Sequence, residues 1–311
     1  MKRRIIQIAE STVLVSLPSK WVKKHNLKKG DEVEVKERGT QIIIETDNKD
    51  ITKKLQIDAT TINERALRYT LGAALKLGFT EIEIKYDSKE QLETVNDILK
   101  NLYVGFASME QKSNKITLKK ISKDLEEEFN PSFRRAFLVT ISLSDSVLDC
   151  IKKSEFNSLL ELINLEKTNN QLTNFCERML NDGIYEHSKT TFLYTILWNL
   201  EKIADEYKYL CKILNENKID LNKNTIKLLE ETNRLLRDYY NLSYEFKIEK
   251  INDLEELRND INLKYLECLK NNNNIELEVI NHIIAIASKC SDFTTNIIGL
   301  NISEDLRKFS S

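Results

Sequence analysis

The second of only two prolines, Pro131, is followed by 180 residues in which apolar side chains recur every three or four positions. This spacing gathers apolar side chains on one face of a helix, and proline is the residue that interrupts helices most strongly. The pattern predicts six helices, at about 132–153, 155–182, 186–215, 222–247, 250–271 and 275–300. Because long helices with short connections pack as antiparallel bundles, we expect residues 129–311 to form an all-α domain.

The third and sixth of these predicted helices repeat their apolar pattern at an offset of 87 residues. In the third helix the repeated positions are Leu193, Ile196, Leu197, Leu200, Ile203, Leu210 and Cys211. They correspond to Ile280, Ile283, Ile284, Ala287, Cys290, Ile297 and Ile298. The repeat indicates two related three-helix bundles, about 132–215 and 222–300, although two amphipathic helices can also match by coincidence.

The first fifty residues have the two-residue period of β-strands instead, in segments 4–8, 12–17, 31–35 and 41–45. Between the second and third segments Pro18 ends the strand, and Trp21, Val22 and Leu27 form the apolar side of a short helix. A turn at 28–31 and a hairpin loop at 38–40 follow. Four strands and one short helix bury too little surface to be stable alone, so a partner chain is expected.

Residues 51–128 mix both patterns, with strands predicted at 55–58, 81–85, 105–111 and 115–120 and helices at 63–77 and 89–102. This order predicts a small α/β connector. The chain is therefore expected to be a multidomain α+β protein with domains at 1–50, 51–128 and 129–311.

Charge is distributed unevenly along the chain. The net charge is -2, yet the first thirty residues carry eight basic side chains and one acidic side chain. That segment has a net charge of +7, which leaves -9 for the rest. Such an asymmetry is typical of a small cationic DNA-contacting surface on an acidic body.

No stretch approaches the roughly 20 uninterrupted apolar residues that span a bilayer, and no signal peptide is evident. Five widely spaced cysteines lie within helical patterns, with no CxxC pair: Cys150, Cys176, Cys211, Cys268 and Cys290. We expect buried thiols in a reducing compartment, and hence a cytoplasmic protein without membrane insertion.

The run at 11–24, followed by the run at 27–33, resembles the AbrB/MazE family of swapped-hairpin domains. It contains a strand, a proline, a short helix with a basic pair, a Gly-Asp turn and a strand in the family's order. The resemblance implies a homodimer whose hairpins interlock into one β-barrel, with basic side chains reaching double-stranded DNA.

Lys23 and Lys24 match the basic pair of this family, and the segment 2–4 lies on its basic first strand. The resulting candidates for phosphate and groove contacts are Lys2, Arg3, Arg4, Lys20, Lys23 and Lys24. Leu14 stands where several DNA-binding members carry an arginine, so DNA binding is implied more strongly than base readout. The alternative for the lysines is a solvated helix face.

The helical region resembles PhoU, a family of six-helix proteins made of two three-helix bundles that attend phosphate homeostasis. The family's hallmark is a Glu-three-residues-Asp pair on the third helix of each bundle, which Glu201 and Asp205 reproduce. A spacing of four residues puts both carboxylates on one helix face. The resemblance implies a divalent or trivalent metal ion at the first bundle.

The other acidic positions depart from the PhoU pattern. The second bundle retains Asp292 but has Ser288 in place of the glutamate, and the second helix carries Glu166 with Asn170. The metal-ligand candidates are therefore Glu201, Asp205, Glu166 and Asp292. A solvated acidic flank of an amphipathic helix is the alternative.

Together the two resemblances match an archaeal architecture and predict a DNA-binding transcriptional regulator of phosphate uptake, with the helical domain as sensor or partner-docking module. The alternative is a signalling adaptor on a phosphate transporter or kinase that uses the barrel mainly to dimerise. An antitoxin is disfavoured, because antitoxins have short tails. An enzyme is not expected, because His25, His187 and His282 are isolated and no nucleophile–base or cofactor motif occurs.

Overall fold

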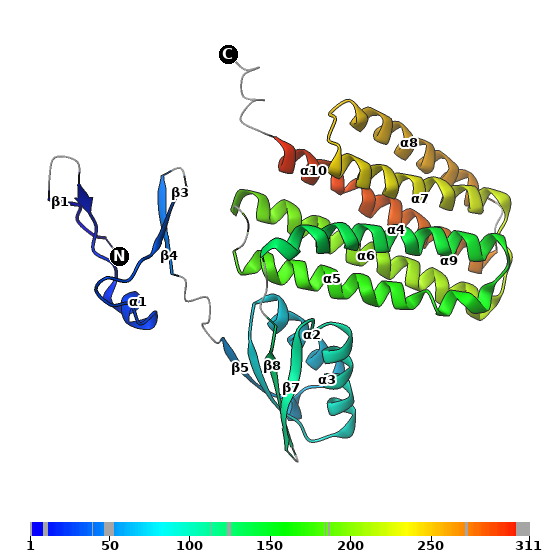
Figure 1. Cartoon of the computed structure of the whole chain (residues 1–311). Helices are drawn as coiled ribbons and strands as arrows, with labels where there is room; N and C mark the ends of the chain where they lie inside the picture. Colours follow the sequence, from blue (N-terminus) through cyan, green and yellow to red (C-terminus); the bar gives the residue numbers. More distant parts are fainter. Residues whose placement is uncertain are drawn as a thin grey trace. The chain divides into compact units, whose positions relative to one another are not determined.

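The computed structural model describes residues 2–8, 12–38, 40–46, 53–112, 114–122, 126–183, 185, 187–270 and 273–302. The chain divides into two compact units, one within residues 1–52 and a larger one within 53–311, which we describe separately (Figure 1). Strands predominate in the first unit, and the second is mostly helical. The protein is thus a multidomain α+β chain.

The N-terminal unit contains β1 (Ile6–Gln7), β2 (Val13–Leu14), α1 (Ser19–Lys24), β3 (Glu34–Arg38) and β4 (Gln41–Glu45). The first two predicted strands are present but much shorter than the segments 4–8 and 12–17. The third lies at Glu34–Arg38 instead of 31–35, and the fourth agrees with the prediction. β1 pairs with β2 and β3 pairs with β4, both antiparallel, as two separate sheets. The described residues of one chain form no closed barrel, and the two-chain barrel stays a prediction.

Local hydrogen bonds account for the turn predicted after the short helix. The Lys28 backbone N–H donates to Asp31 Oδ2 at 2.7 Å, and the Asp31 N–H donates to the Lys28 carbonyl at 3.1 Å. Gly30 between them has φ of +99°, which glycine adopts without steric cost. This turn is confirmed, whereas Gly39 of the predicted hairpin loop lies outside the described residues.

The larger unit begins with the predicted α/β module. Its elements are β5 (Lys54–Asp58), α2 (Glu64–Lys76), β6 (Glu81–Lys85), α3 (Lys89–Asn101), β7 (Phe106–Lys112) and β8 (Lys115–Lys120). The strand order is β5-β6-β8-β7, with β5 parallel to β6 and the other pairs antiparallel. Apolar residues of α2, α3 and the strands form a core of their own.

The helical region contains α4 (Phe129–Lys152), α5 (Ile163–Asn181), α6 (His187–Asn217), α7 (Lys223–Tyr244), α8 (Lys250–Cys268), α9 (Asn274–Ser291) and α10 (Phe293–Asn301). Two predicted helices are interrupted. The second begins as a separate 3-10 turn, Phe156–Leu160, after Ser154 with φ of +54° ends α4. The sixth breaks at Asp292 into α9 and α10, which corrects the single helix expected at 275–300.

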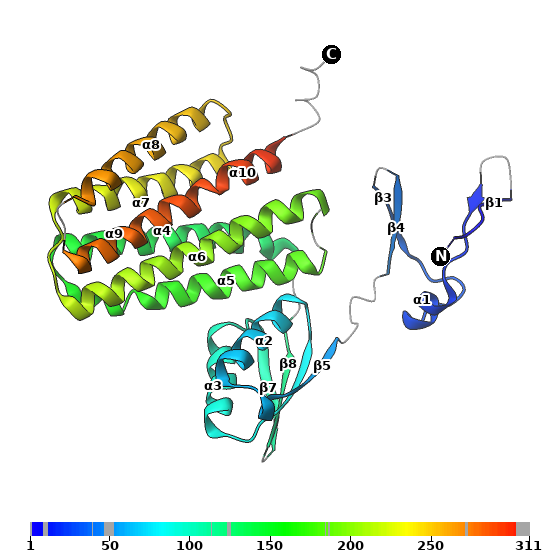
Figure 2. The same ribbon diagram turned by 180° about the vertical axis from the view of Figure 1, so that it is seen from behind.

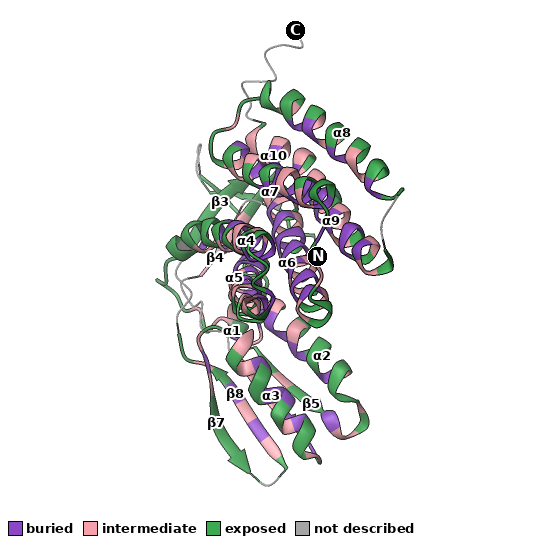
Figure 3. Ribbon diagram, turned by 90° about the vertical axis from the view of Figure 1, so that its right-hand side faces the viewer, coloured by how far each residue is buried: buried purple, intermediate pink, exposed green. Residues whose placement is uncertain are grey.

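Helix packing follows the order of the chain. α4, α5 and α6 contact one another, as do α7, α8 and α9, while α6–α9 and α4–α7 contacts join the two groups (Figures 1 and 2). One continuous apolar core runs through both groups and contains all five cysteines, as expected. Figure 3 shows α8 with mostly exposed positions. No helix in the described part of the chain is long and apolar enough to cross a membrane.

The α/β module is attached to the helical region through the C-terminus of α2. Gly78, with φ of +79°, ends that helix in a Schellman motif, in which Phe79 N–H donates to the Ala74 carbonyl. The buried Arg178 of α5 then donates to the carbonyls of Leu75, Gly78 and Phe79 at 3.0 to 3.3 Å. A guanidinium on these C-terminal carbonyls fixes α2 against α5.

Candidate functional site

The predicted DNA-contacting lysines lie together on α1. Lys20, Lys23 and Lys24 are exposed and occupy one helix face by their spacing of three and four residues. Trp21 is half-buried on the other side, with its ring centroid 4.7 Å from that of His25. Packing on one side thus leaves three ammonium groups free to reach a phosphate backbone on the other.

The remaining basic candidates precede β1. Lys2, Arg3 and Arg4 are exposed and precede β1, which begins at Ile6 and not at Arg4 as predicted. Leu14, which stands at the arginine position of the AbrB/MazE pattern, is 45% exposed in β2. The segment 2–4 and α1 therefore present six basic side chains to solvent.

The predicted metal ligands on α6 are occupied by lysines of the same chain. Lys202 Nζ lies 3.0 Å from Glu201 Oε1 and 3.2 Å from Asp205 Oδ2, and Lys208 Nζ lies 2.5 Å from Asp205 Oδ1. Burial acts to raise the pKa of Asp205. The hydrogen bonds and charges of Lys208 and Lys202 outweigh it, so that this pKa is lowered and the carboxylate stays ionised.

The predicted ligand on α5 meets the same lysine. Glu166 Oε1 accepts from Lys208 Nζ at 2.8 Å and from Asn170 Nδ2 at 2.8 Å. Burial acts to lower the pKa of Lys208, but hydrogen bonds to Asp205 and Glu166 raise it above its usual value. Lys208 is therefore a fixed cation between α5 and α6 at neutral pH.

Asp292 does not join this group among the described contacts. It is exposed at the break between α9 and α10, where its backbone N–H donates to the Cys290 carbonyl. Its own carbonyl accepts from Asn296 Nδ2 at 2.6 Å. The structure thus assigns Asp292 a place at a helix boundary.

The donor set as folded does not fit a divalent or trivalent metal ion. Three predicted ligands are brought together, but their oxygens face Lys202 and Lys208. Across the described residues, no group of three or more His, Cys, Asp or Glu side chains is arranged to hold a metal. Metal binding stays a prediction, and it would require these ammonium groups to move away.

Further charged residues contact the acidic and basic side chains of α5 and α6 just described, at positions that the PhoU motif does not predict. Lys76 Nζ, from α2, lies 2.6 Å from Glu177 Oε2 on α5 and 3.7 Å from Glu201 Oε2 on α6. Acidic and basic side chains therefore alternate from α5 through α6 to α2. We call this set the lysine ladder; its members in spatial order are Glu166, Lys208, Asp205, Lys202, Glu201, Lys76 and Glu177.

Glu177 is the most buried member of the ladder. Its side chain is 0% exposed; Lys76 Nζ lies 2.6 Å from Oε2, while Oε1 has no hydrogen-bond partner among the described residues. Burial, opposed by the charge of Lys76, raises the pKa of Glu177 from 4.5 to about 7. A carboxyl group in this state exchanges a proton near neutral pH.

The Trp198 indole forms one wall of the ladder. Its ring centroid lies 5.3 Å from Lys76 Nζ and 4.8 Å from Lys202 Nζ, so two ammonium groups contact one ring. Trp198 is 43% exposed, whereas Tyr207 and Tyr239 of the same helical region are fully buried.

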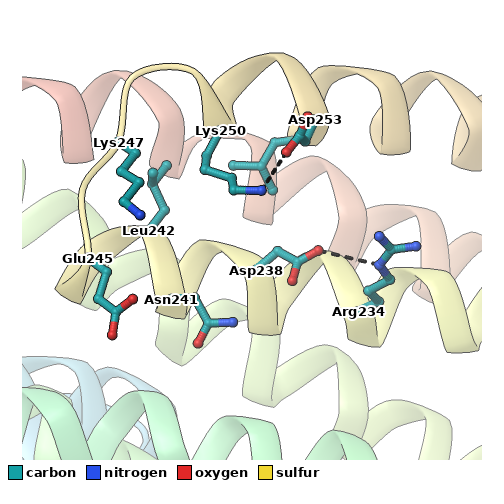
Figure 4. A pocket seen from close by; sticks show the side chains of 9 residues that line it. Arg234, Asp238, Asn241, Leu242, Glu245, Lys247, Lys250 and Asp253 are labelled. Atoms are coloured by element: carbon teal, nitrogen blue, oxygen red, sulfur yellow. Dashed lines mark hydrogen bonds and ion pairs between the residues drawn. The ribbon is translucent and has the colours of Figure 1, made fainter.

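Two recesses lie elsewhere on the helical region. The first, about 270 Å³, lies between α7 and α8 and is lined largely by charged side chains (Figure 4). Arg234 Nε lies 3.5 Å from Asp238 Oδ2, and Lys250 Nζ lies 2.8 Å from Asp253 Oδ2. Each of these two ion pairs joins residues of a single helix.

The second recess, about 260 Å³, has a mainly apolar floor of Phe133, Leu193, Ile196 and Ile297. It is formed by α4, α6, α7 and α10. At its edge the Tyr185 hydroxyl donates to Asn130 Oδ1 at 2.5 Å. Neither recess contains the residues that the sequence motifs singled out.

Comparison with known proteins identifies the N-terminal segment only. Residues 9–52 match the family model described as "Antidote-toxin recognition MazE, bacterial antitoxin". No curated protein and no solved structure shows significant similarity to the chain. The N-terminal domain is thus of the MazE/AbrB type, a kind compatible with a DNA-binding or antitoxin-type regulator, and the match does not extend to residues 53–311.

Proposed function

We propose that this protein is a homodimeric DNA-binding regulator that grips the phosphate backbone through its MazE/AbrB-type domain. The observation that carries the proposal is the exposed basic face of α1, formed by Lys20, Lys23 and Lys24. Lysines at this spacing neutralise neighbouring phosphates and release counterions, which supplies most of the affinity of non-specific DNA binding. The proposal does not involve an enzymatic reaction.

Exposed apolar side chains in the first unit support the dimer. None of the described residues between 2 and 46 is buried, and Ile6, Val35 and Ile42 are 55%, 59% and 70% exposed. Burying one such side chain contributes about 1.5–3 kcal/mol. A second copy of the same domain would cover these surfaces and complete a two-chain barrel.

A direct test of the dimer replaces Val35, which lies opposite Ile44 in the β3–β4 pair, with aspartate. Val35→Asp should convert the chain from twice the monomer mass to the monomer mass in light scattering. Far-UV circular dichroism of the helical region should be unchanged. A wild-type chain that is monomeric at micromolar concentration would refute the dimer.

DNA binding is tested by fluorescence anisotropy on duplex DNA over a range of salt concentrations. The logarithm of the binding constant should fall steeply with log salt, by about 0.9 per phosphate neutralised. Lys23→Ala with Lys24→Ala should weaken binding on all sequences and flatten the slope by about 1 per lysine lost. The matched control, Lys223→Ala with Lys227→Ala, removes the same charge from an exposed face of α7 and should have no effect. A flat salt response of the wild type would reject the proposal.

The regulated process rests on the resemblance alone. We propose phosphate uptake, because Glu201 and Asp205 reproduce the PhoU acidic pair, and we propose that the helical region senses phosphate status or docks on a partner. The same resemblance implies a metal ion at these positions, but Lys202 and Lys208 fill that donor set, so the proposal does not include it. Capture of phosphate-transporter or kinase components by a chain without DNA affinity would favour a signalling adaptor instead.

The family match supports a second candidate, an antitoxin-type regulator, because the matching model is that of an antitoxin family. Such a protein would neutralise a toxin with the segment that follows its DNA-binding domain. Here that segment is a folded α/β module and a helical region, whereas neutralising segments are short. Rescue of cells from a toxin encoded beside this gene would favour the antitoxin role.

A further inference from the structure

The lysine ladder has the composition of a site that already contains its cations. Its four carboxylates alternate with three ammonium groups, and the most exposed side chain, that of Lys202, is only 31% exposed. Each ammonium group contacts two carboxylates at 2.5 to 3.7 Å. Charges this poorly solvated need partners at these distances, and the ladder supplies them from three separate helices.

Lys208 has the central position. Its Nζ lies 2.8 Å from Glu166 Oε1 on α5 and 2.5 Å from Asp205 Oδ1 on its own helix, α6. A metal ion bridging the same two carboxylates would have to lie where this ammonium group is. Because hydrogen bonds to both acids raise the pKa of Lys208, the position is held by a permanent positive charge.

Lys76 forms the same kind of ion pair from the α/β module. Its side chain projects from α2 and lies between Glu177 of α5 and Glu201 of α6. Arg178, the residue after Glu177, holds the C-terminal carbonyls of that same helix. The C-terminal end of α2 is thus held in two ways. Its backbone carbonyls accept hydrogen bonds from Arg178, and its Lys76 side chain forms ion pairs with Glu177 and Glu201.

We propose that the lysine ladder is a closed internal counter-ion site, in which Lys208 takes the place of a metal ion between α5 and α6 and Lys76 uses the same site to bind the α/β module. The acidic motif therefore serves as an attachment point for the chain's own lysines. This inference does not depend on DNA binding by the first unit.

One negative charge in the ladder is left without an ammonium group, since four carboxylates face three lysines. Two buried oxygens show where it lies: Glu177 Oε1 has no hydrogen-bond partner among the described residues, and Glu201 Oε2 is 3.7 Å from the nearest ammonium group, that of Lys76. The two groups flank Lys76. A proton on Glu177 completes the neutralisation, in agreement with its raised pKa of about 7.

The test titrates Mn²⁺ alone into full-length, chelator-treated protein and follows free Mn²⁺ by electron paramagnetic resonance. Wild type should bind no stoichiometric Mn²⁺, because Lys208 holds the position. Lys208→Met frees Glu166 and Asp205 and should bind Mn²⁺ at least tenfold more tightly than wild type. Lys212→Met, an exposed lysine one turn further along α6, is the matched control and should behave as wild type.

Either of two results would overturn the proposal. The first is stoichiometric Mn²⁺ binding by wild type that is lost in Glu201→Ala with Asp205→Ala, since the site would then be open to metal. The second is a folded Lys208→Met chain that gains no Mn²⁺ affinity.

Amine labelling of the native wild-type chain covers the case in which Lys208→Met does not fold. Lys76 and Lys208 should react at least tenfold more slowly than Lys212, as read by mass spectrometry of the digested chain. Labelling of all three lysines at equal rates would overturn the proposal.

Discussion

Replacing Glu177 with glutamine should change how the stability of the protein depends on pH. The wild-type carboxyl is buried beside Lys76, and burial raises its pKa from 4.5 to about 7. Because the folded state binds this proton more tightly than the unfolded state, its stabilising effect is complete below pH 4.5 and is lost as pH rises through 7. The rise in pKa corresponds to about 3 kcal/mol of unfolding free energy.

Urea denaturation followed by far-UV circular dichroism between pH 4 and pH 8 measures this effect. The free energy of unfolding of wild type minus that of Glu177→Gln should fall by about 3 kcal/mol across this range. Loss of the Lys76 contact in the variant adds an offset at every pH and leaves the slope untouched. Glu278→Gln, at an exposed position of α9, should reproduce the wild-type pH dependence. Parallel curves for wild type and Glu177→Gln would refute the burial argument.

Three further substitutions test the packing that positions the ladder. Arg178→Lys cannot span the three carbonyls that the guanidinium holds, so it should destabilise the chain by about 3–5 kcal/mol in urea denaturation. Gly78→Ala forces φ of +79° on alanine and directs its Cβ at Asp182, and should lower the free energy of unfolding by about 1–3 kcal/mol. Tyr207→Phe leaves the buried Asn233 Oδ1, now 2.6 Å from the hydroxyl, without its donor, and should cost about 1–3 kcal/mol in thermal unfolding. Unchanged stability in any of the three would contradict the contact concerned.

Periodicity in the sequence was sufficient to predict most helices and strands. The apolar spacing after Pro131 locates the long helices, since the same residues form the observed core. The break between the first two helices was predicted at residue 154, where Ser154 has φ of +54°. Periodicity did not predict that residues 156–160 form a separate 3-10 turn before α5, or that the last helix breaks at Asp292.

The acidic pair, Glu201 and Asp205, shows a different limit of prediction from the sequence. The spacing of Glu201 and Asp205 correctly places them on one helix face, and Glu166 does lie beside them. What the motif could not predict is the partner, because Lys76 comes from a helix more than a hundred positions away. Glu177 lies eleven positions after Glu166, about three helical turns, and so shares its face of α5. That spacing was the signal available for the most buried member of the ladder.

The proposed two-chain barrel is another feature that the sequence pattern of one chain cannot predict. Alternation predicts the strands, but strand ends depend on neighbours, and β1 and β2 keep only two residues each. In the described first unit no side chain is buried, and the proposed second copy would supply the interactions that lengthen these strands.

Genome-wide mapping of bound DNA tests the central claim most directly, when wild type is compared with Lys23→Ala and Lys24→Ala under phosphate-rich and phosphate-poor growth. Binding by the basic face of α1 predicts discrete enriched sites for the wild type that disappear in the variant. The proposed phosphate link predicts that some of these sites lie at phosphate-transport genes and change with the medium. Equal profiles for wild type and variant in both media would contradict the assignment of this protein as a DNA-binding regulator.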